Sequence, residues 1–88
     1  QPEELQPENV TQLHIRCSRN MCSHDLMNRM RETLIDHPGP CRVYLHLADE
    51  RSEQETVIRA SGQLHVAYSE ALSQLLKTIP AVLEVWYG

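Results

Sequence analysis

The feature that most constrains the fold is the alternation of two hydrophobic periodicities along the chain. Four segments place apolar residues at every second position, which is the pattern of half-buried β-strands. Two other segments place apolar residues three and four positions apart, which is the pattern of amphipathic helices. A chain of 88 residues can bury one core but not two. The sequence therefore predicts one small α/β domain.

The first strand and the first helix have clear boundaries in the sequence. Leu13, Ile15 and Cys17 alternate with polar residues and predict a strand. Ser23 can cap a helix by accepting a hydrogen bond from an early backbone N–H. The segment 37–40, His-Pro-Gly-Pro, is expected to end the helix, because the residue before a proline avoids helical geometry and a glycine tolerates the turn. The expected apolar stripe of this helix consists of Leu26, Met27, Met30 and Leu34.

Three strands, a second helix and a last strand are expected to follow. The strands fall at 43–47, 56–58 and 64–68, with a polar loop at 49–54 and a tight turn at Gly62. Ser69 can cap the second helix, and Pro80 is expected to stop it. The apolar stripe of the second helix consists of Leu72, Leu75, Leu76 and Ile79. The last strand alternates at Leu83, Val85 and Tyr87.

The predicted order is therefore β-α-β-β-β-α-β, in one mixed sheet packed by two helices. The strand-helix-strand connections at each end favour parallel crossovers. Two helices are too few to cover both faces of five strands generously, although Tyr44, on the outward side of its strand, suggests that both faces are at least partly covered.

The start of the chain differs in composition from the rest. The first nine residues carry three glutamates, two prolines and no Lys or Arg. We therefore expect a linker at residues 1–9 and an α/β interaction domain at residues 10–88. A linker at the start of a chain without an initiator Met favours a piece of a longer protein.

Charge and hydropathy disfavour several classes of partner. The net charge is −4, with a single Lys, so an extended phosphate-binding surface is disfavoured and we expect weak or no direct nucleic-acid binding. An auxiliary single-stranded DNA contact through Arg16, Arg42 and Arg59 stays open as an alternative. No apolar run approaches the length of a membrane span, and no signal peptide is visible, which favours a cytoplasmic location without membrane contact.

Three cysteines and five histidines raise the question of a metal site. Cys17, Cys22 and His24 carry the ligand types that zinc prefers, and Cys41 lies downstream. Nothing else in the sequence supplies a second close pair of ligands, and Cys17 falls on the inward side of its strand, where a small buried side chain is expected. We therefore expect no metal, although this group stays a candidate. An odd number of cysteines also favours a reducing compartment.

The inventory of catalytic motifs is sparse. Three well-separated glycines form neither a dinucleotide fingerprint nor a P-loop. Ser23 and Ser69 are already used as helix caps, and the acidic cluster at 49–55 lies in a polar loop. We therefore expect no catalytic residue, no cofactor and no small-molecule substrate in this chain.

Candidate partner-binding residues lie at the end of the sequence. Trp86 and Tyr87 belong to the residue types that dominate interface energetics. The alternation of the last strand turns Tyr87 inward with Leu83 and Val85, and leaves Trp86 on the outer face as the better candidate.

Several segments resemble the C-terminal region of the alpha subunit of bacterial DNA polymerase III. The most distinctive segment is the His-Pro-Gly turn followed by a Val-Tyr-Leu strand, and the similarity in organisation extends from about Thr11 to Tyr87. The segments that carry the resemblance are His37-Pro38-Gly39-Pro40-Cys41-Arg42-Val43-Tyr44-Leu45, Val57-Ile58, Leu64-His65-Val66-Ala67-Tyr68-Ser69 and Leu72-Ser73-Gln74-Leu75-Leu76.

The resemblance implies an incomplete Rossmann-like domain that follows an oligonucleotide-binding fold. It implies that the domain docks the replicative polymerase onto the tau subunit of the clamp loader in DNA replication. The catalytic carboxylates of that DNA-directed DNA polymerase belong to another domain, so no catalytic role transfers to this chain. A non-catalytic interaction domain is therefore the expected function, with a DNA contact or a purely structural spacer as alternatives.

Overall fold

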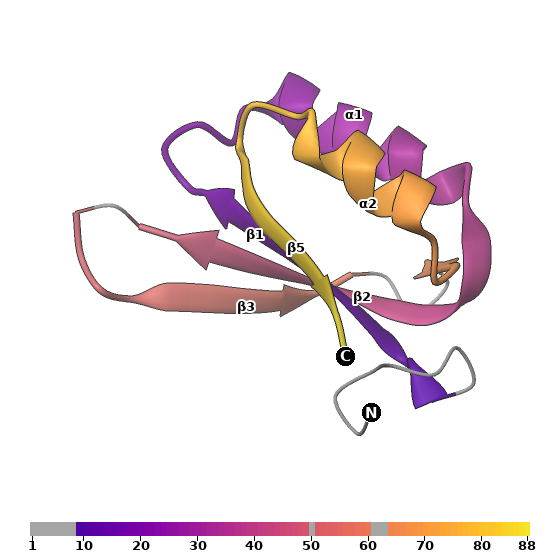
Figure 1. Ribbon diagram of the computed structural model, residues 1–88. Coiled ribbons are helices and arrows are strands. Elements are labelled where there is room, and N and C mark those ends of the chain that lie inside the picture. The colour runs from indigo at the N-terminus through magenta and orange to yellow at the C-terminus, as the bar shows by residue number, and fades with distance from the viewer. Residues whose placement is uncertain (1–8, 50, 61–63) are drawn as a thin grey trace.

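The computed structural model describes residues 9–49, 51–60 and 64–88. Residues 1–8 of the predicted linker 1–9 and the predicted turn at Gly62 lie outside these residues. Within them, five strands and two helices follow in the predicted order (Figure 1). The elements are β1 (Gln12–Ser18), α1 (His24–Ile35), β2 (Pro38–Ala48), β3 (Glu55–Arg59), β4 (His65–Val66), α2 (Glu70–Lys77) and β5 (Val82–Tyr87). The prediction of a small α/β domain with a mixed sheet is confirmed.

The sheet is built around two central parallel strands. Its order is β3-β2-β1-β5, and β1 pairs with β2 in parallel, whereas β5 and β3 pair with them in antiparallel fashion. The long strand β2 carries two partners on the same edge, because β4 pairs with its first half and β3 with its second half. The connection β1-α1-β2 is therefore a parallel crossover, as the strand-helix-strand pattern predicts.

Both helices lie on one face of the sheet, and no helix of the described residues covers the other face (Figure 1). Helix α1 turns Met30 and Leu34 inward, and α2 turns Leu72 and Leu76 inward. These side chains meet the inward residues of the central strands, which are fully buried. The core cluster comprises Val10, Leu13, Ile15, Cys17, Met30, Leu34, Cys41, Val43, Val66, Leu72, Leu76 and Ile79.

The two predicted helix caps are present. The side chains of Ser23 and Ser69 accept hydrogen bonds from the backbone N–H groups of Leu26 and Leu72, each at 3.2 Å. The predicted stripe of α2 is wrong at Leu75, which is 47% exposed. The residues that the short helix buries are instead Leu72, Ser73 and Leu76.

The first helix ends directly before the segment 37–40, as predicted, but the segment does not form the predicted turn. Helix α1 ends with Asp36 as its C-cap, and β2 already begins at Pro38, so the segment starts the strand and is not a separate turn. Gly39 does not adopt a positive φ angle. Glycine is needed there because a Cβ atom at this position would lie 2.4 Å from the Cα atom of Ala67, in the backbone that follows β4. The backbone N–H of Ala67 donates to the carbonyl oxygen of His37 at 2.9 Å and holds the two segments together.

We predict that Gly39→Ala lowers the free energy of unfolding by about 2 kcal/mol or more, because two backbone segments would have to separate. Chemical denaturation monitored by circular dichroism measures this change. Gly88→Ala is the matched control, since a Cβ atom there meets its nearest neighbour, His14 Nε2, at an ordinary 3.7 Å. Equal stability of the two variants would contradict the close-approach explanation.

Candidate binding face on the open side of the sheet

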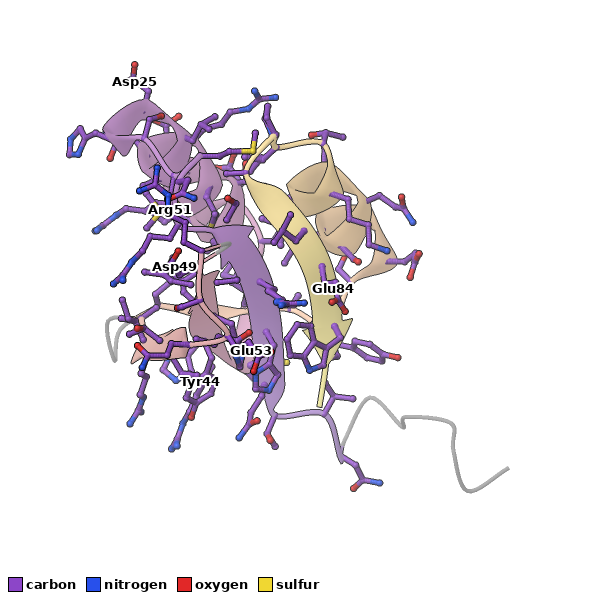
Figure 2. The ribbon with its side chains drawn as sticks, turned by 90° about the vertical axis from the view of Figure 1, so that its left-hand side faces the viewer. Asp25, Tyr44, Asp49, Arg51, Glu53 and Glu84 are labelled. Atoms are coloured by element: carbon purple, nitrogen blue, oxygen red, sulfur yellow. The ribbon has the colours of Figure 1, made fainter. Side chains whose placement is uncertain are left out.

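The helix-free side of the sheet, called the open face below, carries an ordered set of polar and aromatic side chains. Alternation along each strand and the register between strands assign its members. In Figure 2, Tyr44 lies on the opposite side of the sheet from Asp25 in α1. The open face consists of Gln12, His14, Arg16, Arg42, Tyr44, His46, Glu55, Val57, Arg59, His65, Glu84 and Trp86.

Aromatic rings form a row across the three strands β2, β1 and β5. His14 pairs in register with both Tyr44 and Trp86. The ring of His14 stacks on Tyr44 with centroids 5.3 Å apart and on Trp86 with centroids 5.1 Å apart and planes within 6° of parallel. His46 lies against the same row, 5.0 Å from His14 and from Trp86. The partial burial of Tyr44 therefore comes from neighbours on its own sheet and not from a helix.

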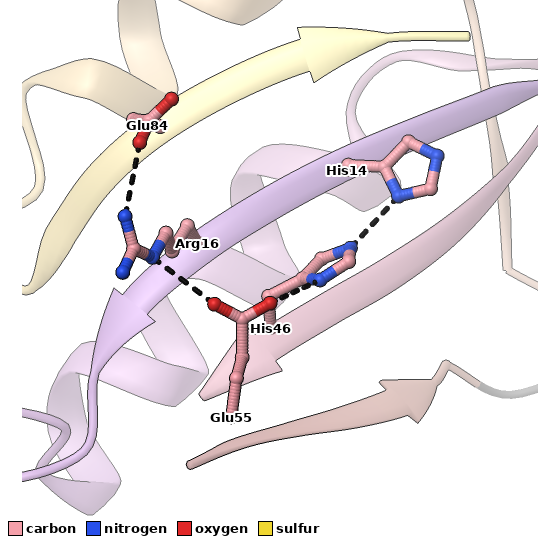
Figure 3. A network of polar contacts seen from close by, with 5 residues as sticks. All are labelled: His14, Arg16, His46, Glu55 and Glu84. Atoms are coloured by element: carbon pink, nitrogen blue, oxygen red, sulfur yellow. Dashed lines mark hydrogen bonds and ion pairs between the residues drawn. The ribbon is translucent and has the colours of Figure 1, made fainter. Parts of the chain in front are cut away.

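A series of polar contacts crosses the open face, and Figure 3 shows the part that joins His14, His46 and Glu55. His14 Nε2 lies 2.9 Å from Gln12 Oε1, and His14 Nδ1 lies 2.8 Å from His46 Nε2. His46 Nδ1 lies 2.8 Å from a carboxylate oxygen of Glu55. These side-chain contacts thus connect the strands β1, β2 and β3.

The two histidines are joined to each other and to an acceptor on either side. Glu55 accepts from His46 Nδ1–H, and the side-chain amide oxygen of Gln12 accepts from His14 Nε2–H. Between the two rings, one of His14 Nδ1 and His46 Nε2 donates and the other accepts, as their tautomers decide. Burial, and next the charge of His46, lower the pKa of His14.

Arg16 extends this network toward β5. Its Nη1 atom donates to Glu84 at 3.1 Å, and its Nε atom lies 3.2 Å from Glu55, although that N–H is not aligned for a hydrogen bond. Glu84 is 60% exposed, so solvent screens its ion pair and each pair contributes only about 0–1 kcal/mol. These pairs orient the side chains of the open face more than they stabilise the fold.

The structure places the two predicted partner-binding residues on opposite sides of β5. Trp86 belongs to the open face and is 38% exposed. Tyr87 turns toward the helices, as its alternation predicts, and its hydroxyl group donates to the carbonyl oxygen of Ala67 at 2.9 Å and accepts from the N–H of Ser69 at 3.1 Å. Tyr87 therefore fixes the start of α2 to β5, and its hydroxyl group is already occupied.

The three arginines of the DNA-contact alternative share the open face. Arg16 is paired with two carboxylates. Arg42 and Arg59 are exposed, and no ion pair joins either one to a carboxylate among the described residues.

The candidate metal ligands lie apart from the open face. Cys17 is buried in the core, and burial, followed by the neighbouring Cys22 thiol, raises its pKa to about 12. Cys22 contacts Met27 Sδ at 3.1 Å, and Cys41 is buried against the carbonyl oxygen of Val10. Across residues 9–49, 51–60 and 64–88, no three His, Cys, Asp or Glu side chains are grouped as metal ligands.

Two hollows accompany these features. One, of about 370 Å³, lies between α1 and the sheet and is mostly apolar; its lining includes Met27, Met30, Leu34 and Leu45, with Arg31 at its edge. The other, of about 370 Å³, lies where β1 and β2 begin, and is lined by Thr11, Gln12, Pro40 and Arg42. Neither lining contains a nucleophile beside a base, which activated-nucleophile catalysis requires.

Sequence reasoning did not single out His14, His46 or Glu55 as members of one site. The signal was present in the outward positions of the first two strands, which read His, Arg, Tyr and His. It becomes informative only when the parallel register sets His14 beside Tyr44 and Arg16 beside His46.

No helix in the described part of the chain is long and apolar enough to span a membrane. Comparisons of the chain with protein-family models, with curated proteins and with solved structures returned no match.

We predict that the stability of the protein falls as the pH drops below about 6.5, the ordinary pKa of histidine, and that His14→Gln reduces this loss. Because the folded state lowers the pKa of His14, the unfolded state binds more protons between the folded pKa and 6.5, so folding weakens there as pH falls. Urea denaturation at a series of pH values measures the slope. His24→Gln, at an exposed position on α1, is the control. If His14→Gln retains the slope of the unmodified protein, the burial of His14 has no role in it.

Proposed function

We propose that this domain is a non-catalytic docking module that binds a protein partner through the open face. The observation that carries the proposal is the row of Tyr44, His14 and Trp86 on a sheet face that no described helix covers. Trp, Tyr and Arg are the side chains most enriched among residues that dominate interface energies, and the open face presents all three. Its neighbours Glu55 and Glu84 supply the mixed polar surroundings of such a patch.

The rigidity of the row supports a docking role. A flexible side chain must lose rotamer freedom on binding, at a cost of about 0.5–1.5 kcal/mol each. His14 is already held by two stacked rings and two polar contacts, so little further ordering is required. Trp86 presents its exposed side on an edge strand whose position is fixed by Tyr87.

The resemblance to the C-terminal region of the DNA polymerase III alpha subunit suggests the partner. We propose that the open face docks the replicative polymerase onto the tau subunit of the clamp loader, in the bacterial cytoplasm. The polymerase active site of such a protein would lie in another domain, so this domain would contribute attachment and not chemistry.

A single-stranded DNA contact is the second candidate, because three arginines share the open face with aromatic rings. Three observations disfavour it against a protein partner. Arg16 is paired with carboxylates, the stacked rings cover both sides of His14, and the net charge is −4. Binding to DNA through phosphates would also weaken steeply as the salt concentration rises.

We predict that Trp86→Ala weakens binding to the clamp-loader tau subunit by about 2 kcal/mol, because a tryptophan that anchors an interface contributes this much or more. Isothermal titration calorimetry of the 88-residue chain with tau measures the affinity. Leu75→Ala is the matched control, since Leu75 is exposed on the outer side of α2 and should leave binding unchanged.

Two results would oppose this proposal. Absence of any heat with the unmodified chain at tens of micromolar tau would remove tau as the partner. Equal losses for Trp86→Ala and Leu75→Ala would remove the open face as the docking surface. If deleting the domain lowered the stability of the longer protein but left its binding to every partner unchanged, the domain would instead be a structural spacer.

A further inference from the structure

The charges of the open face are unevenly distributed along the strands. The register sets side chains in successive rows across the sheet. Arg42 lies in the first row beside Gln12, and Arg59 lies in the next row beside Tyr44. The carboxylates borne by the described strands of this face are Glu84, opposite Arg16, and Glu55, opposite Ala48. One end of the open face is therefore basic, and the opposite end carries the acidic groups.

The two ends also differ in whether their charges are already paired. At the acidic end, Arg16 and His46 hold Glu55, and Arg16 also holds Glu84. At the basic end, Arg42 and Arg59 are exposed and have no carboxylate partner among the described residues. They are diagonal neighbours on paired strands, which places their Cβ atoms within about 7–8 Å. Two such guanidinium groups can donate hydrogen bonds to one carboxylate or to two adjacent carboxylates.

A hollow of about 370 Å³ adjoins the basic end and is lined by Thr11, Gln12, Pro40 and Arg42. It gives an acidic side chain room to approach Arg42 from beside the sheet. The aromatic row begins one row further along, so a ligand that reaches Arg42 and Arg59 also meets Tyr44. The two exposed arginines therefore lie directly beside the aromatic row, at one end of the open face.

We propose that the open face binds an acidic segment of a protein partner, with its carboxylates on Arg42 and Arg59 and an adjacent apolar side chain on the row Tyr44, His14 and Trp86. This inference rests on the proposed docking function and adds the chemistry and the direction of the partner segment. A polyanion such as nucleic acid fits less well, because phosphates continuing across the sheet would meet Glu84 and Glu55. A peptide with its charge confined to one end avoids that repulsion.

The test is a fluorescence-anisotropy titration with two labelled peptides of equal length. One carries glutamates followed by leucines, and the other carries glutamines in place of the glutamates. We expect the acidic peptide to bind more tightly, and we expect Arg42→Glu or Arg59→Glu to weaken its binding by about tenfold or more, because the new carboxylate repels the carboxylates of the peptide. Arg29→Glu, on the exposed side of α1, is the matched charge-reversal control and should retain the affinity of the unmodified chain.

Thermal denaturation of each variant confirms that the exposed substitutions leave the fold intact. Equal affinity for the two peptides, or equal effects of Arg29→Glu and Arg42→Glu, would overturn the inference. Tighter binding of a labelled oligothymidylate than of the acidic peptide would overturn it in favour of nucleic acid. If Trp86→Ala weakens tau binding while neither Arg42→Glu nor Arg59→Glu does, the docking function stands and only the acidic segment fails.

Discussion

The parallel pairing of β1 with β2 is the interaction on which the rest of the structure depends. It aligns Leu13 with Val43 and Ile15 with Leu45, so the inward side chains of both strands form the floor of one core beneath the helices. The same register aligns His14 with Tyr44 and Arg16 with His46 on the opposite face. Because side chains alternate strictly along a strand, a shift of one residue would exchange these two sets and remove both the core and the open face.

Much of the fold follows from local patterns, whereas the site depends on long-range register. Ser23 and Ser69 identify the helix starts because an N-cap is a local interaction between neighbours in sequence. Leu75 has the helical spacing of a buried residue but is exposed, whereas Ser73 is buried. Spacing alone does not tell which flank of Leu72 and Leu76 faces the sheet. The role of Gly39 was also inaccessible to local reasoning, since it depends on the backbone of Ala67, which belongs to a distant segment. The cluster of His14, His46 and Glu55 requires three strands to be in place before it exists.

The open face combines weak individual interactions into an ordered surface. The ion pairs of Arg16 are exposed and contribute little energy one by one. His14 nevertheless takes part both in the ring contacts and in the polar contacts that run from Gln12 to Glu55. Moving this one side chain therefore disturbs several contacts. Such coupling explains how a sheet face without a covering helix can keep its aromatic side chains in defined positions, which is the property that a docking surface requires.

The arrangement also accounts for the division of labour between the two faces. The helix-covered face contains nearly all of the buried apolar residues and two of the three cysteines, and the raised pKa of Cys17 marks an unreactive thiol. The open face instead carries the linked side chains of His14, His46 and Glu55. Burial, and next the neighbouring His46, lower the pKa of His14, so the packing of the row favours its neutral ring. The same histidine therefore links the geometry of the row of rings to the electrostatics of the open face.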